Sequence, residues 1–292
     1  FVNQNFKFYG NTLVGTPTLK ARWKRALEAT DGSLGDALGE LFVKKYFTED
    51  SKKRVNEMVD NLVAAYRVRI DSRDWMSPET KKQAHLKLDK VIRKLGYPDK
   101  WKDYSTLDIK ADAYVSNVFR ANTYSFNEMV NRLGKPIDRK AWMMTAPTIN
   151  AYYNPTINEI VFPAGIMQPV FFNPEADDAV NYGSMGSVIG HELTHGFDDQ
   201  GAQFDADGNL KNWWTKEDME RFKTKTDVLV KQFDSYVAID DIHVKGARTL
   251  GENIADLGGL TIAYYAFKKS LEGKAAPAPI DGTITVMLVV VL

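Results

Sequence analysis

The sequence contains no cysteine and carries no net charge, and each absence excludes a class of protein. Without cysteine, the 292-residue chain has no disulfides and no thiolates, so any metal site must use histidine and carboxylate ligands. Its 38 basic residues balance its 38 acidic residues, which leaves no net field to attract nucleic acid or an anionic membrane. We therefore expect no nucleic-acid partner.

The sequence also lacks a long hydrophobic run and a visible signal peptide. Its most apolar segment, residues 283–292, has ten residues, whereas a helix needs about 20 to cross a bilayer. We expect a buried strand there and no membrane span. No basic segment followed by an apolar run opens the chain, so no signal peptide is visible. Because the chain starts at Phe1 without Met, we expect it to be part of a longer polypeptide.

Hydrophobic residues nevertheless make up 44% of the chain, and their spacing is typical of a mainly helical fold. Residues 20–95 favour several helices. A Ser-Pro-Glu sequence at Ser77 predicts the start of a helix that runs to Leu95. Gly96 ends that helix, and we predict a domain boundary there, between residues 1–95 and residues 96–292.

The second half of the chain adds a small β region and two further helices. In residues 150–162, two tyrosines precede Asn154-Pro155 and branched and aromatic residues follow it, which predicts two short strands around a turn. Helices are predicted from Asp178 onward and over residues 250–271. The residues that can carry chemistry lie on these two helices.

Two of the four histidines lie in His191-Glu192-Leu193-Thr194-His195, which has the pattern H-E-x-x-H. Residues four apart share one face of a helix, so both imidazoles can bind one metal ion. Glu192 would then lie beside the metal and serve as the base that takes a proton from metal-activated water. The alternative interpretation is a chance pattern with two exposed histidines.

A catalytic zinc needs a third protein ligand, and Glu252 on the second predicted helix is the candidate. Asp256 follows four residues later on the same face, where it can accept a hydrogen bond from the free nitrogen of a ligand histidine. An ordinary solvated helix face is the alternative for this pair. The apolar residues around it and the neighbouring Gly258-Gly259, which permits close helix packing, favour the metal site.

Three sequence blocks resemble those of the neprilysin-like zinc endopeptidases, a family that includes neprilysin, the endothelin-converting enzymes and the bacterial oligopeptidases called PepO. The blocks are residues 150–153, 188–199 and 251–256, which occur in the family's order and spacing. The resemblance extends to about Gly282. It implies a mainly α fold with a small β region: a thermolysin-like zinc catalytic domain plus part of a second helical lobe.

The resemblance also implies roles for individual residues. It implies one Zn²⁺ per chain, with His191, His195 and Glu252 as ligands, Glu192 as the base and Asp256 orienting a ligand histidine. The side-chain amide of Asn150 and the carbonyl of Ala151 would hold the substrate backbone. Without the resemblance, a turn-forming role is the alternative for Asn150. A further three residues, for which a core role is the alternative, would line the pocket for the residue after the scissile bond: Ile166, Phe171 and Val188.

We therefore predict an endopeptidase that hydrolyses oligopeptides on the amino side of bulky hydrophobic residues. In the resembling family the chain continues beyond Gly282 with an oxyanion-stabilising histidine and a peptide-binding arginine. No histidine follows His243 here, so neither role is assigned. The alternative is a zinc-containing peptide-binding remnant with little turnover.

The sequence also gives expectations for the source, the location and the partners of the protein. The absence of cysteine and of N-glycosylation acceptors favours a bacterial source over a eukaryotic extracellular one. We expect an extracytoplasmic location, periplasmic or secreted, with the cytoplasm as the alternative. The expected partners are oligopeptide substrates and missing segments of the same polypeptide.

Overall fold

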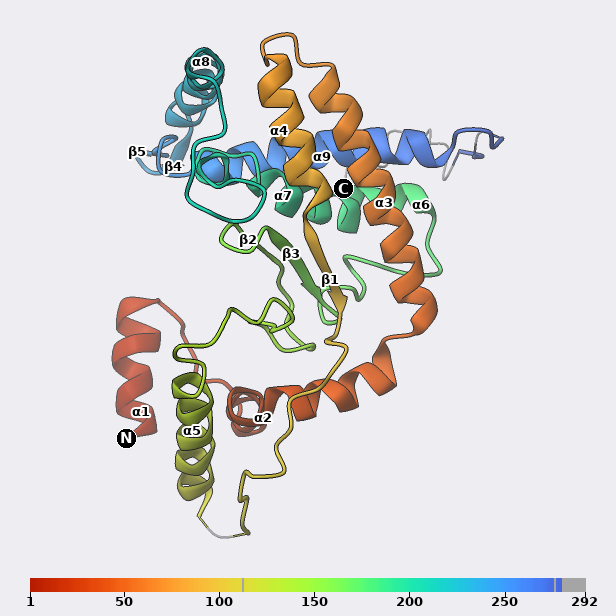
Figure 1. The fold of residues 1–292 in the computed structure, drawn as a ribbon. Coiled ribbons are helices and arrows are strands. Elements are labelled where there is room, and N and C mark those ends of the chain that lie inside the picture. Colours follow the sequence, from red (N-terminus) through yellow and green to blue (C-terminus); the bar gives the residue numbers. More distant parts are fainter. Residues whose placement is uncertain (112, 276, 280–292) are drawn as a thin grey trace. The chain divides into compact units, whose positions relative to one another are not determined.

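A computed structural model describes residues 1–111, 113–275 and 277–279 of the chain (Figure 1). These residues form two compact units. The first unit comprises residues 1–42 and 99–138, and the second comprises residues 43–98 and the described residues from Arg139 onward. The Val-rich segment for which we predicted a buried strand lies outside the described residues.

The first unit is helical. Its elements are α1 (Val2–Asn5), the π-helical segment η1 (Phe6–Leu13), most of α2 (Arg22–Tyr46) and α5 (Tyr114–Val130). Helix α2 has non-helical backbone angles at Leu34 (φ −134°, ψ 34°), which mark a kink. A single residue of α5, Ala121, is buried.

In the second unit, α3 (Glu49–Asp71) shows why the sequence predicts helices before residue 95. The hydroxyl oxygen of Thr48 accepts a hydrogen bond from the backbone N–H of Ser51 at 3.1 Å, which caps the first turn. The apolar side chains at helical spacing then form one buried stripe: Val55, Met58, Val59, Leu62 and Tyr66. Helix formation and burial therefore follow from the same spacing.

The helix predicted from Ser77 to Leu95 begins where expected but ends six residues early. Helix α4 spans Pro78–Asp89, and strand β1 (Ile92–Gly96) follows it. Strand β1 pairs in parallel with β3 (Glu159–Pro163), and Ile92 N–H donates to Asn158 O at 2.9 Å. The prediction for residues 90–95 was wrong because this long-range pairing outweighs the local helical spacing.

The same pairing bears on the predicted division of the chain at Gly96. Strand β1 lies just before that position and belongs to the same sheet as β3, so residues 43–98 share a compact unit with residues from Arg139 onward. The structural units therefore divide the chain at other positions. The predicted boundary at Gly96, between residues 1–95 and residues 96–292, stays a prediction.

The two short strands predicted in residues 150–162 are confirmed. Strand β2 (Tyr152–Asn154) pairs antiparallel with β3, and the turn between them includes Asn158, which has a positive φ of 56°. The sheet order is β1-β3-β2, so β2 is an edge strand. One side of β2 is therefore free to pair with another extended chain.

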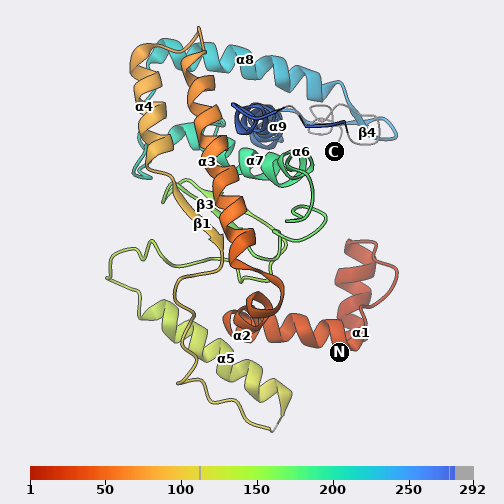
Figure 2. The same ribbon diagram turned by 90° about the vertical axis from the view of Figure 1, so that its right-hand side faces the viewer.

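Both helices predicted to carry the chemistry are also confirmed. A helical run contains α6 (Asp178–Asn181), the π-helical segment η2 (Tyr182–Gly186) and α7 (Ser187–His195), and α9 spans Leu250–Ser270. Helices α7 and α9 lie side by side within the second unit in both ribbon views (Figures 1 and 2). A Cβ atom on Gly190 would lie 2.6 Å from the carbonyl oxygen of Gly259, so this close packing requires glycine.

The remaining elements of the second unit are η3 (Gly201–Gln203), α8 (Lys216–Asp234), β4 (Val237–Ile239) and β5 (Ile242–His243). Strands β4 and β5 form a separate antiparallel hairpin. Among the helices of the described residues, none has the length and apolarity required to cross a membrane.

Candidate metal centre

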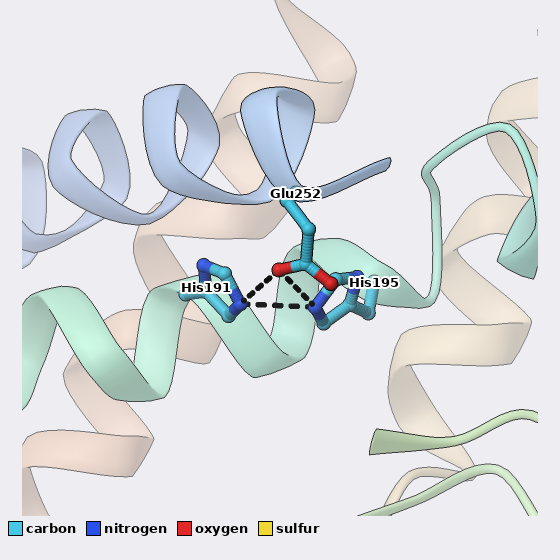
Figure 3. Close-up of side chains that lie close together, drawn as sticks. All are labelled: His191, His195 and Glu252. Carbon is cyan, nitrogen blue, oxygen red and sulfur yellow. Dashed lines mark hydrogen bonds and ion pairs between the residues drawn. The ribbon is translucent and has the colours of Figure 1, made fainter. Parts of the chain in front are cut away.

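The close packing of α7 and α9 brings the three predicted metal ligands together. His191 and His195 lie one turn apart on α7, and their Nε2 atoms are 2.9 Å from each other. Glu252, in the first turn of α9, places Oε2 at 3.3 Å from His191 Nε2 and 3.7 Å from His195 Nε2. Figure 3 shows the three side chains pointing toward a common point, and their ligand atoms all lie within 4.8 Å of one another.

The other ring nitrogen of each histidine is bound by a carboxylate. Nδ1 of His191 contacts Oδ1 of Asp256 at 2.8 Å, as the predicted orienting role of Asp256 requires. Nδ1 of His195 contacts Oδ2 of Asp198 at 2.7 Å. Because a carboxylate accepts hydrogen bonds, each pair favours a proton on Nδ1 and leaves Nε2 free to bind a metal.

This donor set fits zinc. Two imidazole nitrogens and one carboxylate oxygen are typical ligands of a catalytic zinc ion, and three protein ligands leave a fourth position open. The two carboxylates behind the histidines complete the arrangement that commonly surrounds such an ion. Residues 191, 195 and 252 can therefore hold a metal in the geometry observed.

Asp198 also belongs to the candidate site, although no sequence pattern assigned it a role. It is 3% exposed, and its Oδ1 accepts hydrogen bonds from the backbone N–H groups of Gln200 (2.8 Å) and Gly201 (2.6 Å). Burial lowers the pKa of His195, but the hydrogen bond and charge of Asp198 outweigh burial and raise that pKa above its ordinary value. The available signal was the position of Asp198, three residues after a predicted ligand.

Glu192 lies on α7 between the two histidines and is 7% exposed. Burial raises the pKa of its carboxyl group, while the neighbouring His195 and His191 act in the opposite direction. A backbone group of Tyr153, in the edge strand β2, also acts to lower the pKa of that carboxyl. Burial outweighs these opposing effects, so Glu192 is more basic than a solvated glutamate.

A cleft of about 600 Å³ opens over the three ligands. Asn150 and Ala151, predicted to bind the substrate backbone, line it together with Tyr152 and Tyr153 of β2. Glu192 lines it as well. The structure thus brings the edge strand, the predicted base and the predicted ligands to one cavity.

The three residues predicted to form the pocket for a bulky side chain are not among those that line this cleft. Ile166 is 5% exposed, and Phe171 accepts a hydrogen bond on its carbonyl oxygen from the Ser184 hydroxyl at 2.6 Å. Val188 is half-buried on α7, one turn before Glu192. Their role in selectivity stays a prediction.

Comparison with known sequences gives the family of the chain. Residues 1–98 and residues 150–286 each match a model described as peptidase family M13. The endothelin-converting enzyme homolog of Locusta migratoria is 39% identical over 284 residues, which cover 95% of this chain and 39% of that protein. Human endothelin-converting enzyme 1 is 40% identical over 288 residues, which cover 94% of this chain and 37% of that protein.

Solved structures agree with this assignment. The inhibitor complex of the zinc metalloprotease ZMP1 of Mycobacterium tuberculosis matches with a TM-score of 0.92 and 48% identity, over 99% of this chain and 44% of that chain. PepO from Lactobacillus rhamnosis matches with a TM-score of 0.81 and 34% identity, over 91% of this chain and 42% of that chain.

The chain spans about two fifths of the length of the sequence relatives that it matches. The matched regions include all three blocks that carry the resemblance to the neprilysin-like zinc endopeptidases. Endothelin-converting enzymes and PepO, both named by that resemblance, are among the matched proteins. The resemblance is confirmed: the chain belongs to peptidase family M13, the neprilysin-like family.

Proposed function

We propose that this chain carries the catalytic centre of a zinc-dependent endopeptidase that hydrolyses oligopeptides. One observation carries the proposal: three predicted zinc ligands, a buried glutamate and an edge strand meet in a single cleft. Membership of peptidase family M13 supports it. The alternative of a peptide-binding remnant with little turnover is not favoured by that membership.

Glu192 is the proposed general base. Zinc, when bound by His191, His195 and Glu252, supplies a Lewis acid that lowers the pKa of water to about 7 and polarises the peptide carbonyl. The Glu192 carboxylate takes a proton from the attacking water and later delivers it to the departing amine. Its burial, which raises its pKa, makes it a stronger proton acceptor for this role.

The substrate is proposed to bind as an additional strand along β2. The free edge of β2 supports this, because an extended peptide adds to such an edge through main-chain hydrogen bonds. Asn150 and Ala151 lie at the start of that edge and line the cleft. Their proposed role is to hold the peptide backbone, with Asp256 orienting His191.

Selectivity for bulky hydrophobic residues after the scissile bond belongs to the same proposal, with Ile166, Phe171 and Val188 forming the pocket. It would appear as a higher kcat/KM for a peptide with phenylalanine at that position than for one with glycine. Equal kcat/KM values would contradict this part of the proposal.

An extracytoplasmic location in a bacterium and association with further segments of the polypeptide also remain proposals.

Substitution of Glu192 tests the central role. Glu192→Gln preserves size but removes the base, so we expect cleavage of a quenched oligopeptide to fall by about 10²–10⁴-fold while bound zinc stays stoichiometric. Glu217→Gln, an exposed carboxylate on α8, is the matched control and should leave the rate unchanged. Unchanged cleavage in Glu192→Gln would exclude this mechanism, and a wild-type protein without stoichiometric zinc would exclude the function itself.

A further inference from the structure

A buried lysine contacts the segment that follows helix α7. Lys87, in the last turn of α4, is 1% exposed, and its Nζ donates to the carbonyl oxygens of Gly201 (2.6 Å) and Phe204 (2.7 Å). An ammonium group has three N–H donors, and these carbonyls use two of them. The rings of Tyr153, Phe197 and Trp213, with centroids 5.8–5.9 Å from Nζ, surround the group.

The environment of Lys87 makes this ammonium costly to bury. Burial lowers its pKa from the ordinary 10.5 to about 7, although the charges of Asp198 and Asp205 partly oppose the shift. An apolar side chain of similar length would fill the same space without a desolvation cost. What the ammonium adds is two short, directional hydrogen bonds to main-chain carbonyls.

Those carbonyls belong to the segment that orients His195, residues 198–206, here called the strap. Gly201 donates its N–H to Asp198 Oδ1 at 2.6 Å and accepts from Lys87 on its carbonyl oxygen. Asp198 in turn contacts Nδ1 of His195 at 2.7 Å. A continuous chain of hydrogen bonds therefore runs from Lys87 through Gly201 and Asp198 to a predicted zinc ligand.

The strap also packs tightly against the end of α7. A Cβ atom on Gly201 would overlap the carbonyl oxygen of His195, so the strap passes His195 with no room for a side chain. A small displacement of Gly201 would therefore shift both Asp198 and the His195 backbone. Because Lys87 holds the Gly201 carbonyl, Lys87 also limits these shifts.

A second connection joins Lys87 to the edge strand. The Asn158 amide donates to the carbonyl oxygens of Lys87 (2.9 Å) and Ala206 (3.1 Å), and its Oδ1 accepts from the Tyr153 hydroxyl at 3.0 Å. Tyr153 also lines the cleft. The end of α4, the strap and β2 are thus joined by the hydrogen bonds of Asn158, which is 1% exposed.

We propose that Lys87 is a positioning residue of the metal centre, which fixes the His195 imidazole through Gly201 and Asp198. The proposal rests on the proposed zinc site. Loss of the ammonium removes the charged donor from both carbonyls, which keep only the Phe204 N–H on Gly201 O (3.0 Å) and Trp213 Nε1 on Phe204 O (2.9 Å). The strap is then held less firmly, and Asp198 fixes the orientation of His195 less well.

The test is the dissociation constant for Zn²⁺, measured by competition with a chromophoric chelator on metal-free protein. We expect Lys87→Met to weaken Zn²⁺ binding by about 10-fold, within the range found when an outer hydrogen-bond partner of a zinc ligand is lost. Lys90→Met is the matched control: Lys90 directly follows α4, pairs with Asp207 at 2.7 Å, and its side chain is 43% exposed. We expect it to bind Zn²⁺ like the wild type.

A double-variant cycle separates positioning from general destabilisation. If Lys87 acts through Asp198, Lys87→Met combined with Asp198→Asn should bind Zn²⁺ about as weakly as Asp198→Asn alone. Fully additive losses would overturn the proposed route. If Lys87→Met does not fold, Lys87→Gln, which keeps two N–H donors, replaces it and should lose less affinity.

The outcomes distinguish this inference from the proposed function. A wild-type protein that binds Zn²⁺ and cleaves peptide, with Lys87→Met binding Zn²⁺ equally well, would overturn the role of Lys87 alone. A wild-type protein with no zinc affinity would overturn the proposed function first. A lower unfolding temperature in Lys87→Met with unchanged Zn²⁺ affinity would mean that the lysine is merely structural.

Discussion

The two predicted histidine ligands are held by carboxylates in opposite surroundings. Asp256 reaches His191 from the neighbouring helix α9, and 78% of its side chain is exposed. Asp198 reaches His195 from the strap, and 5% of its side chain is exposed. The contact distances, 2.8 Å and 2.7 Å, are nearly the same. Distance alone therefore says little about how strongly each carboxylate constrains its histidine, and burial should decide it.

The largest expected difference is in zinc affinity. Asp198→Asn removes a buried charge whose attraction is weakly screened, and we expect Zn²⁺ binding to weaken by about 100-fold. Asp256→Asn removes a solvated charge, and the expected loss is about 10-fold. Chelator competition with each purified variant measures both. Equal losses would mean that burial does not distinguish the two carboxylates.

The sequence predicted Asp256 but not Asp198, and the physical reason is the kind of element that carries each. Asp256 lies four residues after Glu252 on a predicted helix, so spacing alone places both on one face. Asp198 lies beyond the end of α7, where the path of the strap depends on hydrogen bonds to Gln200, Gly201 and Lys87. Helical periodicity carries no information about such a path.

Stability of the metal-free protein should show the next largest difference. Asp198→Ala leaves the backbone N–H groups of Gln200 and Gly201 without their acceptor inside the protein, and we expect a loss of about 2–3 kcal/mol. Asp256→Ala removes an exposed side chain, and its effect should stay within about 0.5 kcal/mol. Urea unfolding in the presence of a chelator gives both values. A large loss for Asp256→Ala would show that the exposed carboxylate also supports the fold.

Asp218 is another buried carboxylate, but it is not one of the residues that contact the predicted metal ligands. Its substitution therefore separates the effect of losing a buried carboxylate from the effect of losing a contact with a ligand. Its Oδ2 accepts hydrogen bonds from the backbone N–H of Ser77 (2.9 Å) and from the Ser77 hydroxyl, which joins the starts of α4 and α8. We expect Asp218→Ala to cost about 1–2 kcal/mol in urea unfolding and to leave Zn²⁺ affinity unchanged. Weaker Zn²⁺ binding in this variant would mean that general destabilisation lowers zinc affinity, which would undermine the comparison.

The contribution of Asp218 should also depend on pH. Burial alone would raise its pKa, but hydrogen bonds from Ser77, Thr80 and Thr215 outweigh burial and hold the pKa well below its usual range. The stabilisation is thus fully present above the unfolded-state pKa of about 3.9 and is lost as the pH falls toward the lower folded-state value. The difference in unfolding free energy between the wild type and Asp218→Ala should therefore narrow as the pH falls below about 3.9, the unfolded-state pKa.

The fold shows the same limit of sequence reasoning as the site. Helices α3, α7 and α9 and strands β2 and β3 follow from local spacing and turn residues, and the structure confirms them. Strand β1 was missed because its partner, β3, lies more than sixty residues away in the sequence. Lys87 was missed for a related reason, since a lysine near a helix end is ordinarily solvated and its burial here depends on the strap.

The smallest expected effect is the response to salt, and it tests the comparison without altering the fold. Raising the ionic strength from about 0.1 M to about 1 M shortens the screening length from about 10 Å to about 3 Å, which weakens exposed charge pairs far more than buried ones. The affinity lost in Asp256→Asn, taken as a ratio to wild type at the same salt, should shrink from about 10-fold to about 3-fold. The ratio for Asp198→Asn should stay constant, because solvent ions do not reach a side chain that is 5% exposed. If both ratios fell together, Asp198 would be reached by solvent in solution, and the contrast between the two carboxylates would disappear.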